Sequence, residues 1–104
     1  MSERAFQKEV LAFLDKHEKI ALVWRSDSDF TKGRCTQSKF RIGVPDVQAI
    51  SKKGLPLFLD LKAKKGVRRP AQVEWMRKAD AAGCFTVFAY CMDDVVKFMD
   101  RVPN

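Results

Sequence analysis

The sequence predicts an α/β fold in which one mixed central sheet of about four strands is flanked by helices. Apolar residues recur at helical spacing near both ends of the chain, and short apolar runs typical of strands lie between them. Glycine or proline marks several of the transitions. With 104 residues, the chain is expected to form a single domain, residues 1–104.

The first half of the chain is expected to contain one helix and two strands. Apolar residues over 3–16 share one helical stripe, and the run over 20–24 is short and apolar, as in a buried strand. Residues 26–41 are largely polar and basic, so we expect a loop or hairpin there. A strand over 47–50 follows, and Lys52-Lys53-Gly54 then reverses the chain.

The second half is expected to contain two strands and two helices. Residues 57–63 have the pattern of a third strand. Pro70 begins a helix at the position where a missing N–H costs least, and Gly83 ends it. A fourth strand is expected over 84–90 and a last helix over 93–101.

The composition favours a polyanion as partner. The formal net charge is +7 and the isoelectric point is about 9.6, as expected of a protein that binds nucleic acid. Three cysteines without a CxxC spacing fit a reducing compartment, so we expect a cytoplasmic protein without a membrane partner. The single histidine leaves too few parts for a histidine-dependent catalytic triad or a multi-histidine metal site.

An acid and a lysine share one face of the predicted third strand. Side chains alternate along a strand, so Asp60 and Lys62 point the same way while the leucines at 57, 59 and 61 point to the other face. Burying either charge unpaired is costly. A structural ion pair, or an edge strand with a polar outer face, is one explanation, and a metal ion is another.

Asp46 is expected to join this pair. Gly43 and Pro45 set Asp46 at the start of a strand, and a hairpin between the strands over 47–50 and 57–63 brings Asp46 near Asp60 at its open end. Two adjacent carboxylates repel unless a cation holds them, and oxygen ligands favour Mg²⁺ or Mn²⁺. The alternative for Asp46 is an ordinary turn aspartate.

The spacing of these residues resembles a known family. Pro45-Asp46, a gap of thirteen residues and then Asp60-Leu61-Lys62 resemble the signature of PD-(D/E)xK nucleases. The wider pattern, from residue 3 to about residue 99, resembles the stand-alone, phage-type VRR-NUC (virus-type replication-repair nuclease) domain. The matching segments are Gly43-Val44-Pro45-Asp46, Leu59-Asp60-Leu61-Lys62, Gln72 with Trp75, Ala82-Gly83, and upstream Ser2-Glu3, Gln7, Leu14 and Val23-Trp24-Arg25.

The resemblance implies a PD-(D/E)xK nuclease-like core and a metal-dependent phosphodiesterase. It implies that Asp46, Asp60 and the backbone carbonyl of Leu61 hold Mg²⁺ or Mn²⁺. It also implies that Lys62 positions or activates the attacking water and that Gln72 supports the catalytic groups. The family more often has glutamate at the position of Asp60, and the superfamily pattern permits either acid.

A glutamate on the first helix usually completes the family's site. Glu3 continues the apolar stripe of that helix toward the core, whereas Glu9 lies at its margin, nearer solvent. The family pattern, with a glutamate four residues before a glutamine, also selects Glu3. The alternative is that Glu3 satisfies the helix dipole.

The basic residues are expected to hold phosphates on either side of the cleaved bond, the alternative being a solvated surface. Trp24 and Trp75 are expected in the core rather than as base-stacking residues. The candidate nucleic-acid-binding residues are Arg25, Lys32, Arg34, Lys39, Arg41, Lys64, Lys65, Arg68 and Arg69.

The resulting expectation is an endonuclease that cuts branched DNA, such as Holliday junctions, as a homodimer in a bacterial or phage-infected cell. A junction offers paired cleavage sites, and one small subunit cuts one strand at a time. A non-catalytic basic nucleic-acid-binding module with a nuclease-like fold is the main alternative. A ribonuclease is a third.

Overall fold

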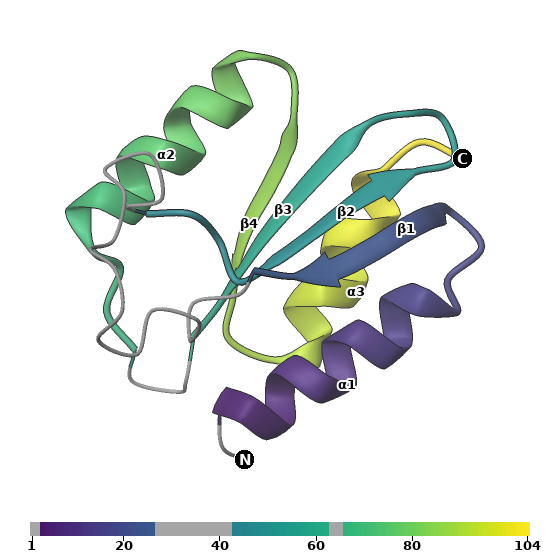
Figure 1. Cartoon of the computed structure of the whole chain (residues 1–104), viewed down its shortest axis with the longest axis horizontal. Helices are drawn as coiled ribbons and strands as arrows, with labels where there is room; N and C mark the ends of the chain where they lie inside the picture. Colours follow the sequence, from purple (N-terminus) through teal and green to yellow (C-terminus); the bar gives the residue numbers. More distant parts are fainter. Residues whose placement is uncertain (1–2, 27–42, 63–65) are drawn as a thin grey trace, which may run out of the picture.

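The computed structural model describes residues 3–26, 43–62 and 66–104, in which four strands form one mixed sheet (Figure 1). In spatial order they are β1 (Ile20–Arg25), β2 (Val47–Ser51), β3 (Pro56–Leu61) and β4 (Phe85–Ala89). β2 runs antiparallel to both β1 and β3, and β4 joins β3 in parallel. The predicted mixed sheet of four strands is confirmed.

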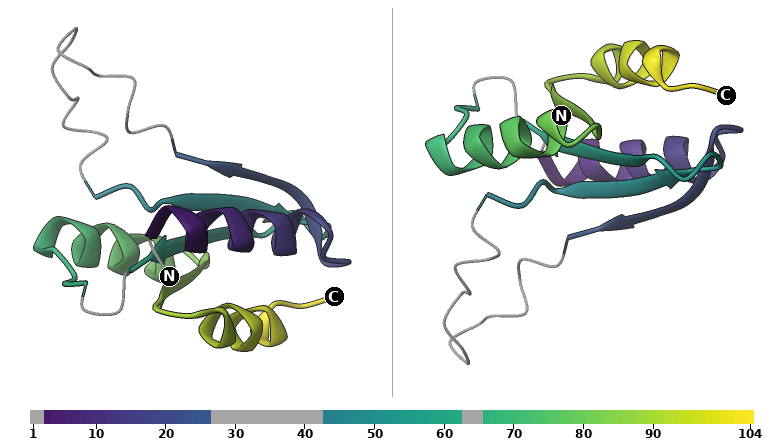
Figure 2. Two further views of the ribbon diagram at one scale, coloured as in Figure 1. Left: turned by 90° about the horizontal axis from the view of Figure 1, so that it is seen from below. Right: turned by 90° about the horizontal axis from the view of Figure 1, so that it is seen from above.

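Three helices, α1 (Glu3–Asp15), α2 (Pro70–Ala81) and α3 (Met92–Arg101), cover the sheet. Figure 2 shows α1 and α3 together on one side, where Val10, Leu59 and Phe98 belong to one buried cluster. On the opposite face Trp75 of α2 packs edge-on against Phe58 of β3, with ring centroids 4.7 Å apart. No helix among the described residues is long and apolar enough to span a bilayer.

The predicted third strand is too long. It was expected over 57–63, but β3 ends at Leu61. The backbone N–H of Lys62 still donates to the carbonyl oxygen of Ala89 at 2.8 Å, so the pairing with β4 extends one step beyond the strand. Residues 63–65 lie outside the described part of the chain. The other described element ends agree with the predicted ones to within two residues.

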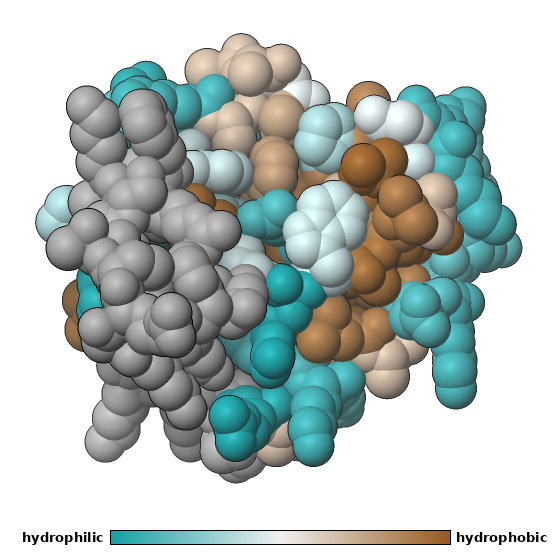
Figure 3. Space-filling model, viewed as in Figure 1, coloured by the Kyte–Doolittle hydropathy of each residue, from teal (hydrophilic) through white to brown (hydrophobic). Residues whose placement is uncertain are grey.

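The prediction that β1 is a buried strand is wrong. It is the edge strand of the sheet, and the side chains of Leu22 and Trp24 are 60% and 42% exposed. Both face away from α1 and α3, and Figure 3 shows apolar side chains gathered on this surface over β1 and β2. The core placement expected for Trp24 is therefore also wrong, whereas Trp75 is half-buried against Phe58.

A tight turn joins β2 to β3. The hydroxyl oxygen of Ser51 accepts hydrogen bonds from the backbone N–H groups of Lys53 (3.2 Å) and Leu55 (3.1 Å). Gly54 has a φ of +81°, which glycine adopts without steric cost. This turn fixes the predicted hairpin and its register.

The register of the hairpin brings two acids together. Val47 lies opposite Leu59 in the antiparallel pairing of β2 with β3. One step further toward the open end, Asp46 comes opposite Asp60. The proximity expected from the sequence is confirmed, because this register places the two residues side by side and the Asp60 carboxyl raises the pKa of Asp46.

The loop that carries Asp46 packs against the start of α2. Gly43 has a φ of +84°, and a Cβ atom built on it would overlap the carbonyl group of Ala71, 2.7 Å from its carbon. The same atom would lie 3.2 Å from the backbone nitrogen of Gln72. Only glycine allows this approach, so Gly43 sets the distance between the Asp46 loop and α2.

We predict that Gly43→Ala destabilises the protein by roughly 1–3 kcal/mol more than Gly54→Ala, because it adds overpacking to the cost of the left-handed backbone. Gly54 is a matched control, since its φ of +81° is similar and a Cβ there meets nothing within 4 Å. Urea unfolding of the two variants measures the difference. Equal losses of stability would contradict the close packing of Gly43 on α2.

Candidate active site

Asp60 is a buried acid near the end of β3. It is 1% exposed, and neither carboxylate oxygen accepts a hydrogen bond from the described residues. The ammonium of Lys62 lies 3.4 Å from its Oδ2 atom. Burying an ionised carboxylate costs several kcal/mol unless its lone pairs are satisfied. Asp60 therefore lacks the hydrogen bonds that a purely structural ion pair would have.

Asp46 lies beside Asp60, just before β2. Its Oδ2 atom accepts a hydrogen bond from the backbone N–H of Leu61 at 2.9 Å. Burial raises the pKa of Asp46 to about 7, and the neighbouring Asp60 carboxyl raises it as well. The N–H of Leu61 and the charge of Lys62 act in the opposite direction without cancelling these effects. The positive charge and hydrogen-bond donors near the two carboxyl groups are thus too few to keep the pKa of Asp46 at its usual value.

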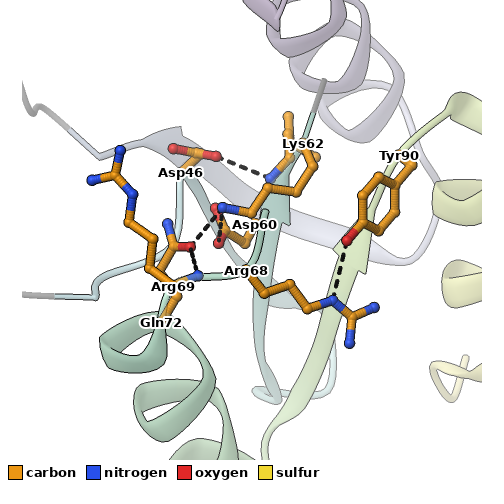
Figure 4. Close-up of polar contacts among 8 residues, drawn as sticks. Asp46, Asp60, Lys62, Arg68, Arg69, Gln72 and Tyr90 are labelled. Carbon is orange, nitrogen blue, oxygen red and sulfur yellow. Dashed lines mark hydrogen bonds and ion pairs between the residues drawn. The ribbon is translucent and has the colours of Figure 1, made fainter. Parts of the chain in front are cut away.

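Lys62 is held between the acids and α2. Its Nζ atom donates to Oε1 of Gln72 at 2.6 Å, as Figure 4 shows. The same Gln72 oxygen accepts the backbone N–H of Arg69 at 3.1 Å, which fixes the orientation of the amide. Gln72 lies in the first turn of α2, where Pro70 begins the helix as predicted. The helix thereby positions the lysine that directly follows β3.

The two carboxylates suit a hard divalent cation. Asp60 offers oxygens with no hydrogen-bond donor among the described residues, and Asp46 is more readily ionised with added positive charge nearby. Mg²⁺ is commonly bound by one or two carboxylates and keeps several waters. The described residues contain no cluster of three or more acidic, histidine or cysteine ligands, so backbone oxygens and water would complete the shell. Leu61, the predicted backbone ligand, directly follows Asp60 at the end of β3, and its N–H donates to Asp46.

The choice between Glu3 and Glu9 stays a prediction. Glu3 begins α1, but its side chain lies outside the described part of the structure. Glu9 lies on the same helix and is exposed, as expected from its place at the margin of the apolar stripe.

Three of the candidate nucleic-acid-binding residues are described, and all are exposed: Arg25 at the end of β1, and Arg68 and Arg69 before α2. In Figure 4 the side chains of Arg68 and Arg69 extend to opposite sides of Asp60. The remaining candidates lie outside the described residues: Lys32, Arg34, Lys39, Arg41, Lys64 and Lys65.

Two aromatic residues of the C-terminal half position Arg68, and the sequence analysis missed both. The guanidinium lies over the ring of Phe88, 4.5 Å from its centroid, and Nε donates to the hydroxyl of Tyr90 at 3.2 Å. Phe88 lies opposite Asp60 in the parallel pairing of β3 with β4. Knowledge of this pairing would have identified the two aromatic residues, because it brings alternate residues of β4 to the side of the sheet that carries Asp60.

Comparison with solved structures finds a chain described as a VRR_NUC domain protein. The match has a TM-score of 0.68 and covers 97% of this chain and 87% of the other, at 18% sequence identity. This chain has the fold of a VRR_NUC domain protein. No protein-family model matches the sequence, and no curated protein matches it significantly. The α/β fold implied by the resemblance is therefore confirmed, and the chemistry rests on the residues themselves.

We predict that, in EDTA, stability falls as the pH rises from about 4 to about 7. The unfolded Asp46 carboxyl has a pKa near 4 and the folded one a pKa of about 7, so the folded state binds more protons between these values. Linkage then makes stability decrease with rising pH in this window. Urea unfolding across the range measures the slope.

The Asp46→Asn variant isolates this contribution, because other groups also titrate in this range. It should lack the part of the slope that Asp46 supplies and, near pH 7, should be more stable than the unmodified protein. Added Mg²⁺ should recover stability near pH 7 in the unmodified protein but not in the variant. Parallel profiles for the two proteins would contradict the raised pKa of Asp46.

Proposed function

We propose that this chain is a Mg²⁺- or Mn²⁺-dependent phosphodiesterase that cuts DNA internally and prefers branched DNA such as Holliday junctions. One observation carries the proposal. Asp60, buried and without a hydrogen bond to its carboxylate oxygens from the described residues, lies beside Asp46 and Lys62 on the fold of a VRR_NUC domain protein.

Asp46 and Asp60 would hold the metal ion, with the backbone carbonyl of Leu61 as a further oxygen ligand. When bound, a divalent ion lowers the pKa of a ligand water and offsets the negative charge of a phosphate. The protein's own part is to keep a buried and a partly buried carboxylate side by side, where solvent weakens their attraction for a cation less than at an open surface.

Lys62 would act on the attacking water or on the phosphate. Its ammonium has three N–H donors, of which one is directed at Gln72 and one lies toward Asp60. The third is available to a water or to a phosphate oxygen on which negative charge develops. Gln72 restrains the ammonium, so that it is already oriented when the substrate binds.

Arg68 and Arg69 would hold phosphates on either side of the cleaved bond. Their side chains extend to opposite sides of Asp60 (Figure 4). Phe88 and Tyr90 keep the Arg68 guanidinium in place. A guanidinium held in this way loses less freedom when it binds a phosphate. The net charge of +7 supports such binding without a requirement for a particular base sequence.

Preference for a junction follows from symmetry. A four-way junction presents two equivalent strands for cleavage, and a single site of this size reaches one of them. A homodimer with a two-fold axis would present two sites in matching orientation. We therefore expect paired cuts on a junction rather than single cuts on a linear duplex.

The test is cleavage of labelled four-way junction, linear duplex, single-stranded DNA and RNA in Mg²⁺, Mn²⁺ or EDTA. We predict metal-dependent cleavage, fastest on the junction, that falls at least about 10²-fold in Asp46→Asn. The matched control is Lys53→Ala, which removes one exposed charge from the turn at the far end of the hairpin. It should cleave as the unmodified protein does.

Each contrary result identifies another function. Tight DNA binding without cleavage in any metal would contradict the enzyme and support a non-catalytic binding module. Faster cleavage of RNA than of any DNA would show that the protein is a ribonuclease, and the proposed metal-dependent phosphodiester hydrolysis would still hold. Equal rates on junction and duplex would remove only the preference for branched DNA.

A further inference from the structure

Ser26 binds the loop that carries Asp46 at two consecutive carbonyl groups. Its hydroxyl donates to the carbonyl oxygen of Pro45 at 2.6 Å, and its backbone N–H donates to the carbonyl oxygen of Asp46 at 2.8 Å. Pro45 is fully buried and has no N–H of its own, and Ser26 binds this segment through its carbonyl oxygens. Ser26 directly follows β1.

Two further side chains hold Ser26 in this orientation. Nε2 of Gln48 donates to the Ser26 hydroxyl oxygen at 2.9 Å, and Oε1 of Gln48 accepts the indole N–H of Trp24 at 3.1 Å. Trp24 and Gln48 lie opposite each other in the pairing of β1 with β2. Each group donates to the next, so the hydrogen bonds run in one direction from Trp24 to Pro45 and strengthen one another.

We propose that Ser26 and Gln48 are positioning residues for the metal-binding carboxylate of Asp46, with Trp24 as the outer end of the chain of hydrogen bonds. This inference rests on the proposed function. The Asp46 carboxylate is held against a second acid, so a loop free to move would turn it away from Asp60. Ser26 restrains the backbone on either side of the Asp46 Cα atom, at the carbonyl before it and the carbonyl after it.

A purely structural role is the competing explanation. The same hydrogen bonds satisfy a buried carbonyl group and close the end of β1 against β2, which stabilises the sheet whether or not a metal binds. The two roles differ in one measurable quantity. A positioning residue changes the affinity for the metal, by about 10–100-fold for a partner of a metal ligand, whereas a structural residue changes only stability.

The experiment measures Mn²⁺ affinity by calorimetry or electron paramagnetic resonance, which does not require cleavage. We predict that Ser26→Ala weakens Mn²⁺ binding about tenfold or more and that Ser26→Thr, which keeps the hydroxyl, restores most of it. Gln48→Leu should also weaken Mn²⁺ binding, but less than Ser26→Ala does. It removes the hydrogen bond that Gln48 donates to the Ser26 hydroxyl and leaves that hydroxyl in place.

The matched control is Ser51→Ala. Its hydroxyl group, like that of Ser26, takes part in two hydrogen bonds, and it accepts both of them in the turn at the opposite end of the hairpin. The variant should therefore lose stability and keep its Mn²⁺ affinity. Unchanged Mn²⁺ affinity in both Ser26→Ala and Gln48→Leu would overturn the inference and leave the proposed function in place. Absence of Mn²⁺ binding by the unmodified protein would overturn both.

Discussion

The close approach of Asp46 and Asp60 is the interaction on which the rest of the site depends. Each carboxylate repels the other, and burial removes water that would stabilise their charges. The register of the β2–β3 hairpin enforces the approach, while Lys62 and the N–H of Leu61 offset part of its cost. What remains is a deficit of positive charge, and a divalent cation has the charge and the preference for oxygen that would remove it.

The sheet separates the residues that stabilise the fold from those that form the site. On one face α1 and α3 enclose a continuous apolar cluster, which includes Leu57, Leu59 and Leu61 of β3. The intervening residue Asp60 points to the other face, toward α2 and Gln72 (Figure 4). The strand that carries the costly acid is thus held by packing in which the acid takes no part, and a site on so rigid an element keeps its geometry.

The sequence was sufficient to predict the acid pair but not its surroundings. Alternation and a tight turn leave one register for the hairpin, so Asp46 and Asp60 meet wherever that hairpin forms. An apolar run does not reveal whether a helix covers its second face, so the exposure of Trp24 could not be predicted. The contacts of Ser26 and Arg68 depend on how loops and a parallel strand are placed, and no local pattern encodes that placement.

The central claim is that the two carboxylates form a metal site. Anomalous diffraction from crystals soaked in Mn²⁺ tests it most directly, because the signal locates the ion without reference to activity. The structure predicts a Mn²⁺ peak at bonding distance, roughly 2.0–2.3 Å, from carboxylate oxygens of both Asp46 and Asp60. No peak between them near neutral pH would contradict the account.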